Sequence, residues 1–79
     1  MNYQLYIARD PTICGGEPII KGTRVLVRTI LASLADGDSM EEILADFPTV
    51  TKEDVRAIIA FAAASAEEDL PLQRVPDMP

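Results

Sequence analysis

The sequence predicts a mainly α domain in which a short N-terminal β arm precedes three helices. One apolar template, with hydrophobic residues at i, i+3, i+4 and i+7, occurs three times between residues 27 and 62. The chain is 48% hydrophobic but contains only two Phe, two Tyr and no Trp, so its core is aliphatic, which favours helices over a β-sandwich. Gly and Pro interrupt the first 26 residues, where a turn-rich arm is expected.

The arm comprises residues 1–26. Residues 3–7 place Tyr3, Leu5 and Ile7 on one face and predict a short strand, which Asp10 and the following proline interrupt. Two pairs of β-branched or aliphatic residues then alternate with Gly and Pro, which is typical of a compact hairpin. The glycines that can adopt a positive φ in its turns are Gly15, Gly16 and Gly22.

The three helices are predicted at about residues 27–36, 40–47 and 52–68. Gly37 is placed for a left-handed cap after the first helix, and Pro48 stops the second. The residues of the three apolar stripes are Val27, Ile30, Leu31 and Leu34; Met40, Ile43, Leu44 and Phe47; and Val55, Ile58, Ile59 and Ala62.

The starts of the second and third helices are marked independently of these stripes. Ser39 and Glu42 have the spacing of a capping box, and Thr51 and Asp54 repeat it. Glu53 adds a negative charge at the positive end of the third helix dipole. These two helices are therefore the most firmly predicted elements.

Residues 1–69 are expected to form a single domain, and residues 70–79 an extended, Pro-rich tail. The tail nevertheless keeps apolar side chains that could fold into a partner's groove. The alternative is a frayed terminus in which Leu70 and Leu72 pack back on the domain. The candidate partner-binding residues are Leu70, Leu72, Val75 and Met78.

The third helix carries a second apolar stripe, formed by Ala57, Phe61 and Ala64. A helix that is apolar on more than one side is generally buried on more than one side, which predicts a homodimer interface in so small a chain. The alternative is that alanine simply has a high helix propensity and tolerates exposure.

The charge distribution restricts any contact with DNA to a local surface. The formal net charge is −6, but residues 1–28 carry +2 and residues 29–79 carry −8. A basic cluster in the arm could contact phosphates, and a dimer would duplicate it. The alternative is that its arginines form salt bridges to the acidic helices. The candidate residues are Lys21, Thr23, Arg24 and Arg28.

The second and third helices, joined by residues 48–50, have the proportions of a helix-turn-helix. Thr51, Lys52 and Arg56 would then be candidate DNA-binding residues at the start of the recognition helix. Acidic residues in the same first turn oppose this interpretation, and the two cations could instead pair with neighbouring acids.

The sequence predicts neither an enzyme nor a metal or cofactor site. It has no histidine and one cysteine, so the usual nucleophile-and-base pairs and zinc ligands are missing. Cys14 is expected to be a small buried hydrophobe. With no signal-peptide pattern and no stretch of about 20 apolar residues, we expect a cytoplasmic protein without a membrane span.

The residues ICGGEPIIKGTRV (13–25), SMEEIL (39–44) and TKEDVRA (51–57) resemble the domain-of-unknown-function family four-three-three over about residues 3–70. The resemblance implies a homeodomain-like helical fold and an antitoxin that neutralises a PIN-like nuclease toxin and represses its own operon through operator DNA. Many members read Arg-Ile-Pro-Val where this chain has Arg24-Val25-Leu26-Val27, which leaves the start of the first helix less sharply fixed. The alternative function is a protein-interaction module without nucleic-acid contact.

Overall fold

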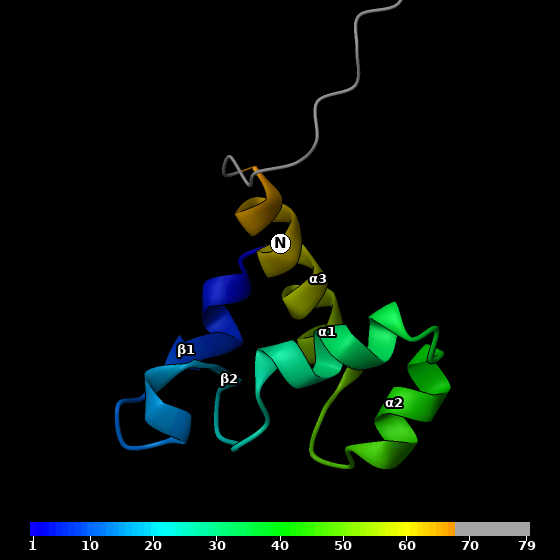
Figure 1. Ribbon diagram of the computed structural model, residues 1–79, viewed down its shortest axis with the longest axis horizontal. Helices are drawn as coiled ribbons and strands as arrows, with labels where there is room; N and C mark the ends of the chain where they lie inside the picture. Colours follow the sequence, from blue (N-terminus) through cyan, green and yellow to red (C-terminus); the bar gives the residue numbers. More distant parts are fainter. Residues whose placement is uncertain (68–79) are drawn as a thin grey trace, which may run out of the picture.

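The computed structural model describes residues 1–67, which form two short strands and three α-helices (Figure 1). The predicted mainly α fold with an N-terminal hairpin is thereby confirmed. The elements in chain order are the 3₁₀ turn η1 (Tyr3–Leu5), β1 (Ile7–Arg9), the 3₁₀ turn η2 (Cys14–Gly16), β2 (Pro18–Ile20), α1 (Val27–Ala35), α2 (Met40–Asp46) and α3 (Lys52–Ala66).

The two strands form an antiparallel hairpin in which Ile7 is paired with Ile20 and Arg9 with Pro18. The predicted strand at residues 3–7 is wrong, because a 3₁₀ turn forms there and β1 begins only at Ile7. The Asn2 side chain starts this turn by accepting a hydrogen bond from the Gln4 backbone N–H at 3.1 Å. The alternating apolar residues at positions 3, 5 and 7 therefore predicted an ordered element in the right region, but that element is a 3₁₀ turn and not a strand.

A tight turn follows β2 and leads the chain toward α1. Gly22 adopts a φ of 78°, and the Thr23 backbone N–H donates to the Ile20 carbonyl oxygen at 3.1 Å. The Thr23 hydroxyl donates to the same carbonyl at 2.8 Å and accepts from the Val25 N–H at 3.0 Å. This turn holds the residues on either side of Gly22 in a fixed geometry.

The helix starts agree with the sequence prediction, and each helix ends one or two residues early. α1 begins at Val27 although Leu26 provides no side-chain cap, and it ends before Gly37, whose φ is 92°. Both predicted capping boxes are present at Ser39 and Thr51. Local hydrogen bonding thus sets the start of α2 and α3.

The core is aliphatic and is shared by the hairpin and all three helices. Ile59 is an exception to the predicted third stripe, because it is 48% exposed, whereas Val55, Ala57 and Ile58 are fully buried. α3 is therefore rotated so that Ala57 faces inward. The buried core residues are Ile7, Ile20, Val27, Ile30, Ile43, Val50, Val55, Ala57 and Ile58.

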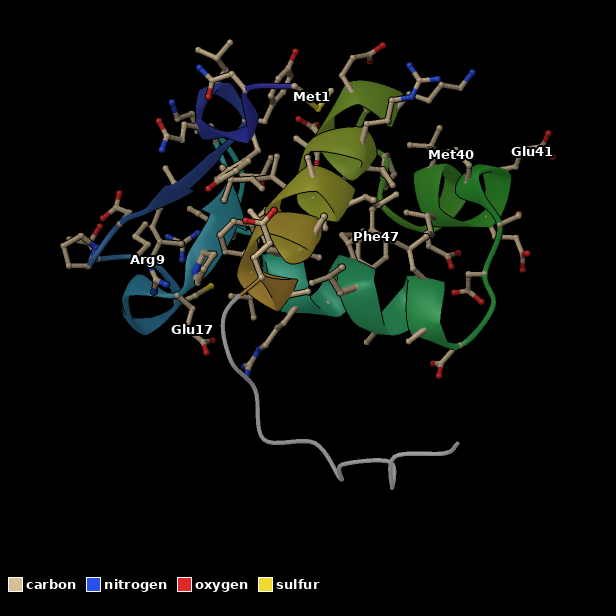
Figure 2. The ribbon with its side chains drawn as sticks, turned by 90° about the horizontal axis from the view of Figure 1, so that it is seen from above. Met1, Arg9, Glu17, Met40, Glu41 and Phe47 are labelled. Carbon is tan, nitrogen blue, oxygen red and sulfur yellow. The ribbon has the colours of Figure 1, made fainter. Side chains whose placement is uncertain are left out.

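The helix α3 runs through the middle of the molecule, with the hairpin on one side and α2 on the other (Figures 1 and 2). It contacts α1, α2, η1 and β1, which explains why it is apolar on more than one side. Within residues 1–67, no helix is long and apolar enough to cross a bilayer.

Candidate functional site

A hollow that is open to solvent lies on the hairpin side of the molecule. Its volume is about 660 Å³, and it is formed by β1, the loop after it and the turn after β2. The hollow contains no residue of α1, α2 or α3. Its lining residues are Ala8, Arg9, Asp10, Pro11, Ile13, Ile19, Lys21, Gly22, Thr23 and Arg24.

Three cations, Arg9, Lys21 and Arg24, line this hollow. Lys21 is fixed by the end of the hairpin ladder, where its backbone N–H donates to the Tyr6 carbonyl at 2.8 Å. Arg9 was not among the predicted site residues, because it lies 12 positions before Lys21 in the sequence, and the two residues line one hollow only because β1 pairs with β2. The feature of the sequence that could have identified Arg9 as a site residue is its position as a cation at the end of β1.

The hollow carries a net positive charge in an otherwise acidic chain. Asp10 is its one carboxylate, and hydrogen bonds from the Thr12 side chain and backbone hold the pKa of Asp10 below its ordinary value of 3.8, with Arg24 nearby contributing. The Thr12 hydroxyl and N–H lie 2.6 and 2.9 Å from the same Asp10 oxygen, Oδ1. Three cations and one carboxylate give +2, against −6 for the whole chain.

The loop before β2 shapes one wall of the hollow. Arg9 donates from its guanidinium to the Gly16 carbonyl oxygen at 3.3 Å, which ties β1 to this loop; Figure 2 labels Arg9 at the hairpin end. The prediction that Cys14 is buried is wrong, because its side chain is exposed and its Sγ lies 3.7 Å from the Arg24 carbonyl oxygen. The backbone at Cys14 is left-handed, with φ of 50°.

The remaining predicted arm residues have other positions. Thr23 lines the hollow, but its hydroxyl is engaged in the turn after β2. Arg28 does not line the hollow; its guanidinium lies 3.2 Å from the Glu17 carboxylate, and its side chain is 71% exposed. Of the two alternatives for the arginines, a salt bridge therefore forms for Arg28, but its acidic partner Glu17 belongs to the arm and not to the acidic helices.

The predicted DNA-binding residues of α3 are exposed at its N-terminal end. The Thr51 hydroxyl accepts from the Asp54 N–H at 3.1 Å, and the Asp54 carboxylate accepts from the Thr51 N–H at 3.0 Å. Lys52 and Arg56 form no salt bridge within residues 1–67. The structure thus leaves two cations and the acidic Glu53 exposed here, in a group separate from the hollow.

The predicted dimer stripe on α3 is largely covered within a single chain. Ala57 is completely buried, and the Phe61 ring packs against Tyr3 with its centroid 5.4 Å from the other ring. Ala64 is half-buried. The inference that α3 is buried on a second side was correct, but η1 and the hairpin provide that contact, so Ala57 is unavailable to a second copy.

Two further predictions concern metal ligands and the tail. In the described part of the chain, no group of three or more Cys, Asp or Glu residues is arranged to hold a metal ion. The predicted partner-binding residues Leu70, Leu72, Val75 and Met78 lie outside the described residues.

Comparison with known proteins gives a consistent family assignment. A family model described as "Protein of unknown function (DUF433)" matches residues 7–62. Uncharacterized protein y4eO from Sinorhizobium fredii (strain NBRC 101917 / NGR234) is 37% identical over 59 residues, which are 75% of this chain and 27% of that protein. The crystal structure of a DUF433 member protein from Anabaena variabilis ATCC 29413 is similar, with a TM-score of 0.73 and 34% identity.

The similarity extends over 81% of this chain and 63% of the Anabaena chain. This chain therefore corresponds to about a quarter of the Sinorhizobium protein and to less than two thirds of the Anabaena one.

Proposed function

The chain belongs to the DUF433 family, and on that basis we propose that it is an antitoxin-like binding protein that contacts operator DNA through the basic hollow of its hairpin. The observation that carries the DNA proposal is the gathering of Arg9, Lys21 and Arg24 around one hollow on an acidic chain. Neutralisation of a PIN-like nuclease toxin is the second part of the proposal, and it follows from the family resemblance of residues 13–25.

Electrostatics favour a small, well-defined DNA contact over general affinity for nucleic acid. DNA presents about one negative charge per 1.7 Å of helix axis, so its phosphates are attracted to a local cluster of guanidinium and ammonium groups. The acidic remainder of the chain repels the rest of the duplex and limits nonspecific binding. Contacts from arginine and lysine to phosphates position a protein on the DNA backbone, and the cations of the hollow could serve this role.

The exposed start of α3 is the second candidate DNA contact. Lys52 and Arg56 share one helix face, and the capped starts of the consecutive helices α2 and α3 support the proposal of a homeodomain-like helix-turn-helix. In this arrangement α3 would read bases while the hairpin holds phosphates. Glu53 and Asp54, the two acidic residues in the first turn of α3, both oppose phosphate at this end.

Binding to the duplex upstream of the gene, measured by fluorescence anisotropy at two salt concentrations, tests the DNA proposal. We expect affinity to fall with salt at a logarithmic slope of about −2 to −3, since roughly 0.9 counterion is released per neutralised phosphate and three cations line the hollow. The variants Arg9→Ala and Arg24→Ala should each weaken binding and reduce the slope by about 1.

Arg28→Ala is the matched control, because it removes an arginine of the same region that does not line the hollow. It should leave DNA affinity unchanged. Equal losses for Arg28→Ala and Arg24→Ala, or no effect of either hollow variant, would contradict the role of the hollow.

The second candidate function is a protein-interaction module without nucleic-acid contact, and the net charge of −6 favours it. Complete absence of DNA binding at low salt would support this function.

Toxin binding is tested separately: removal of residues 70–79 should abolish affinity for the toxin and leave the far-ultraviolet circular dichroism of the helices intact. Unchanged toxin affinity would exclude the tail as the contact.

A further inference from the structure

A second, smaller cavity lies where the start of β2, α1 and α3 meet. Its volume is about 120 Å³. Apolar cavities of roughly 150 Å³ hold a benzene-sized group, so this one is suited to a single aliphatic side chain. Its lining residues are Glu17, Pro18, Val27, Arg28, Leu31 and Phe61.

The floor of the pocket is apolar and its edge is charged. Val27 is buried, while Leu31 and Phe61 are half-buried and pack against the core, so each keeps apolar surface that another apolar group could cover. Glu17 and Arg28 form a salt bridge of 3.2 Å beside this surface. Covering the half-exposed apolar atoms with an aliphatic side chain is favourable at about 25 cal/mol per Å².

The chain itself supplies such side chains shortly after α3. Glu67 lies six residues beyond Phe61, which corresponds to about 9 Å along a helix. An extended chain spans up to about 3.3–3.6 Å per residue, so residue 70 reaches about 10 Å and residue 72 about 17 Å from Glu67. Leu70 and Leu72 are the first apolar residues after Glu67. The chain must reverse direction to return to the level of Phe61, and of these two residues only Leu72 has the length of chain to do so.

We infer that this pocket is the docking site for Leu72 of the same chain. The contact fastens the beginning of the C-terminal segment to the surface formed by Val27, Leu31 and Phe61. Val75 and Met78, which follow at a greater distance along the chain, then stay available to a partner protein. The inference concerns the isolated chain, and its test uses neither DNA nor toxin.

Nuclear magnetic resonance of the full chain tests this docking. We expect nuclear Overhauser effects between the methyl groups of Leu72 and the ring protons of Phe61. The double variant Leu70→Ser/Leu72→Ser should abolish them and shift the methyl resonances of Val27 and Leu31. The double variant Val75→Ser/Met78→Ser is the matched control and should preserve both the cross-peaks and the shifts.

Three outcomes would overturn the inference. The first is the absence of these cross-peaks in the natural chain together with unchanged Val27 and Leu31 shifts in the Leu70→Ser/Leu72→Ser variant. The second is loss of the cross-peaks in the Val75→Ser/Met78→Ser variant. The third is their appearance only between differently labelled chains in a mixed sample, which would identify a second copy as the source of the docked residue.

Discussion

The Tyr3 ring meets the Phe61 ring edge to face, with the ring centroids 5.4 Å apart and the planes inclined by 70°. Tyr3 belongs to the first turn of the chain and Phe61 to the helix that follows all the other elements. The pair therefore joins the two ends of the described structure and lies on the side of α3 that the sequence predicted to face a second copy of the chain.

Tyr3→Leu is expected to destabilise the protein by about 0.5–1.5 kcal/mol, because it removes the edge-to-face interaction while keeping apolar bulk. Urea unfolding measures this change. Leu5→Ala is the control from the same turn; its side chain is 66% exposed, and the unfolding midpoint should barely move. Equal midpoint shifts in the two variants would show that the ring pair has no special contribution.

Ser39→Ala and Thr51→Ala should each cost about 1 kcal/mol, since each removes a hydroxyl that accepts a backbone N–H at a helix start. Thermal or urea unfolding monitored by circular dichroism provides the measurement. Thr49→Ala serves as the control, because Thr49 is exposed and lies in the connection before the cap of α3. The prediction fails when all three variants unfold alike.

The Glu42 carboxylate makes the stability of α2 dependent on pH. Hydrogen bonds with the backbone and side chain of Ser39 hold the pKa of Glu42 below its ordinary value of 4.5. A carboxyl whose pKa is lowered by folding contributes its full stabilisation above the unfolded pKa and loses it as the pH falls through the folded pKa.

We therefore expect stability to decline as the pH falls below about 4.5, and the decline should be smaller in Glu42→Gln, which cannot titrate. Urea midpoints across this range, compared with those of Glu41→Gln at an exposed position of the same helix, measure the difference. A Glu42→Gln variant with the same pH dependence as the natural chain would contradict this assignment.

Gly22→Ala is expected to destabilise the protein by about 1 kcal/mol, because a Cβ disfavours the left-handed region in which Gly22 lies. No atom lies within 4 Å of the position that this Cβ would occupy, so the cost is conformational rather than steric. Gly22→Asn should cost less, since asparagine tolerates this region. This explanation is refuted if the Gly22→Ala variant is as stable as the Gly22→Asn variant or more stable, as judged by their unfolding midpoints.

The salt bridge between Glu17 and Arg28 should contribute little. Both side chains are substantially exposed, at 44% and 71%. A double-mutant cycle with Glu17→Gln and Arg28→Gln is expected to give a coupling energy of about 0.2–1 kcal/mol that decreases as salt is added. A larger, salt-independent coupling would indicate that the pair is shielded from solvent by another part of the protein.

The sequence alone determined the three helices and the two capped starts. The hydrogen bonds of a capping box connect residues three positions apart, so Ser39 with Glu42, and Thr51 with Asp54, specify the starts of α2 and α3 whatever the rest of the chain does. The same holds for the glycine that ends α1, whose left-handed conformation depends on its immediate neighbours.

Only the tertiary structure decided which surfaces meet. Arg9 and Lys21 line one hollow because β1 pairs with β2, and one side of the Phe61 ring is in contact with Tyr3 because η1 packs against α3. These contacts are made by residues many positions apart in the sequence, and the packing of the whole core decides which of them come together. The helix starts, in contrast, depend on hydrogen bonds between residues of a single turn.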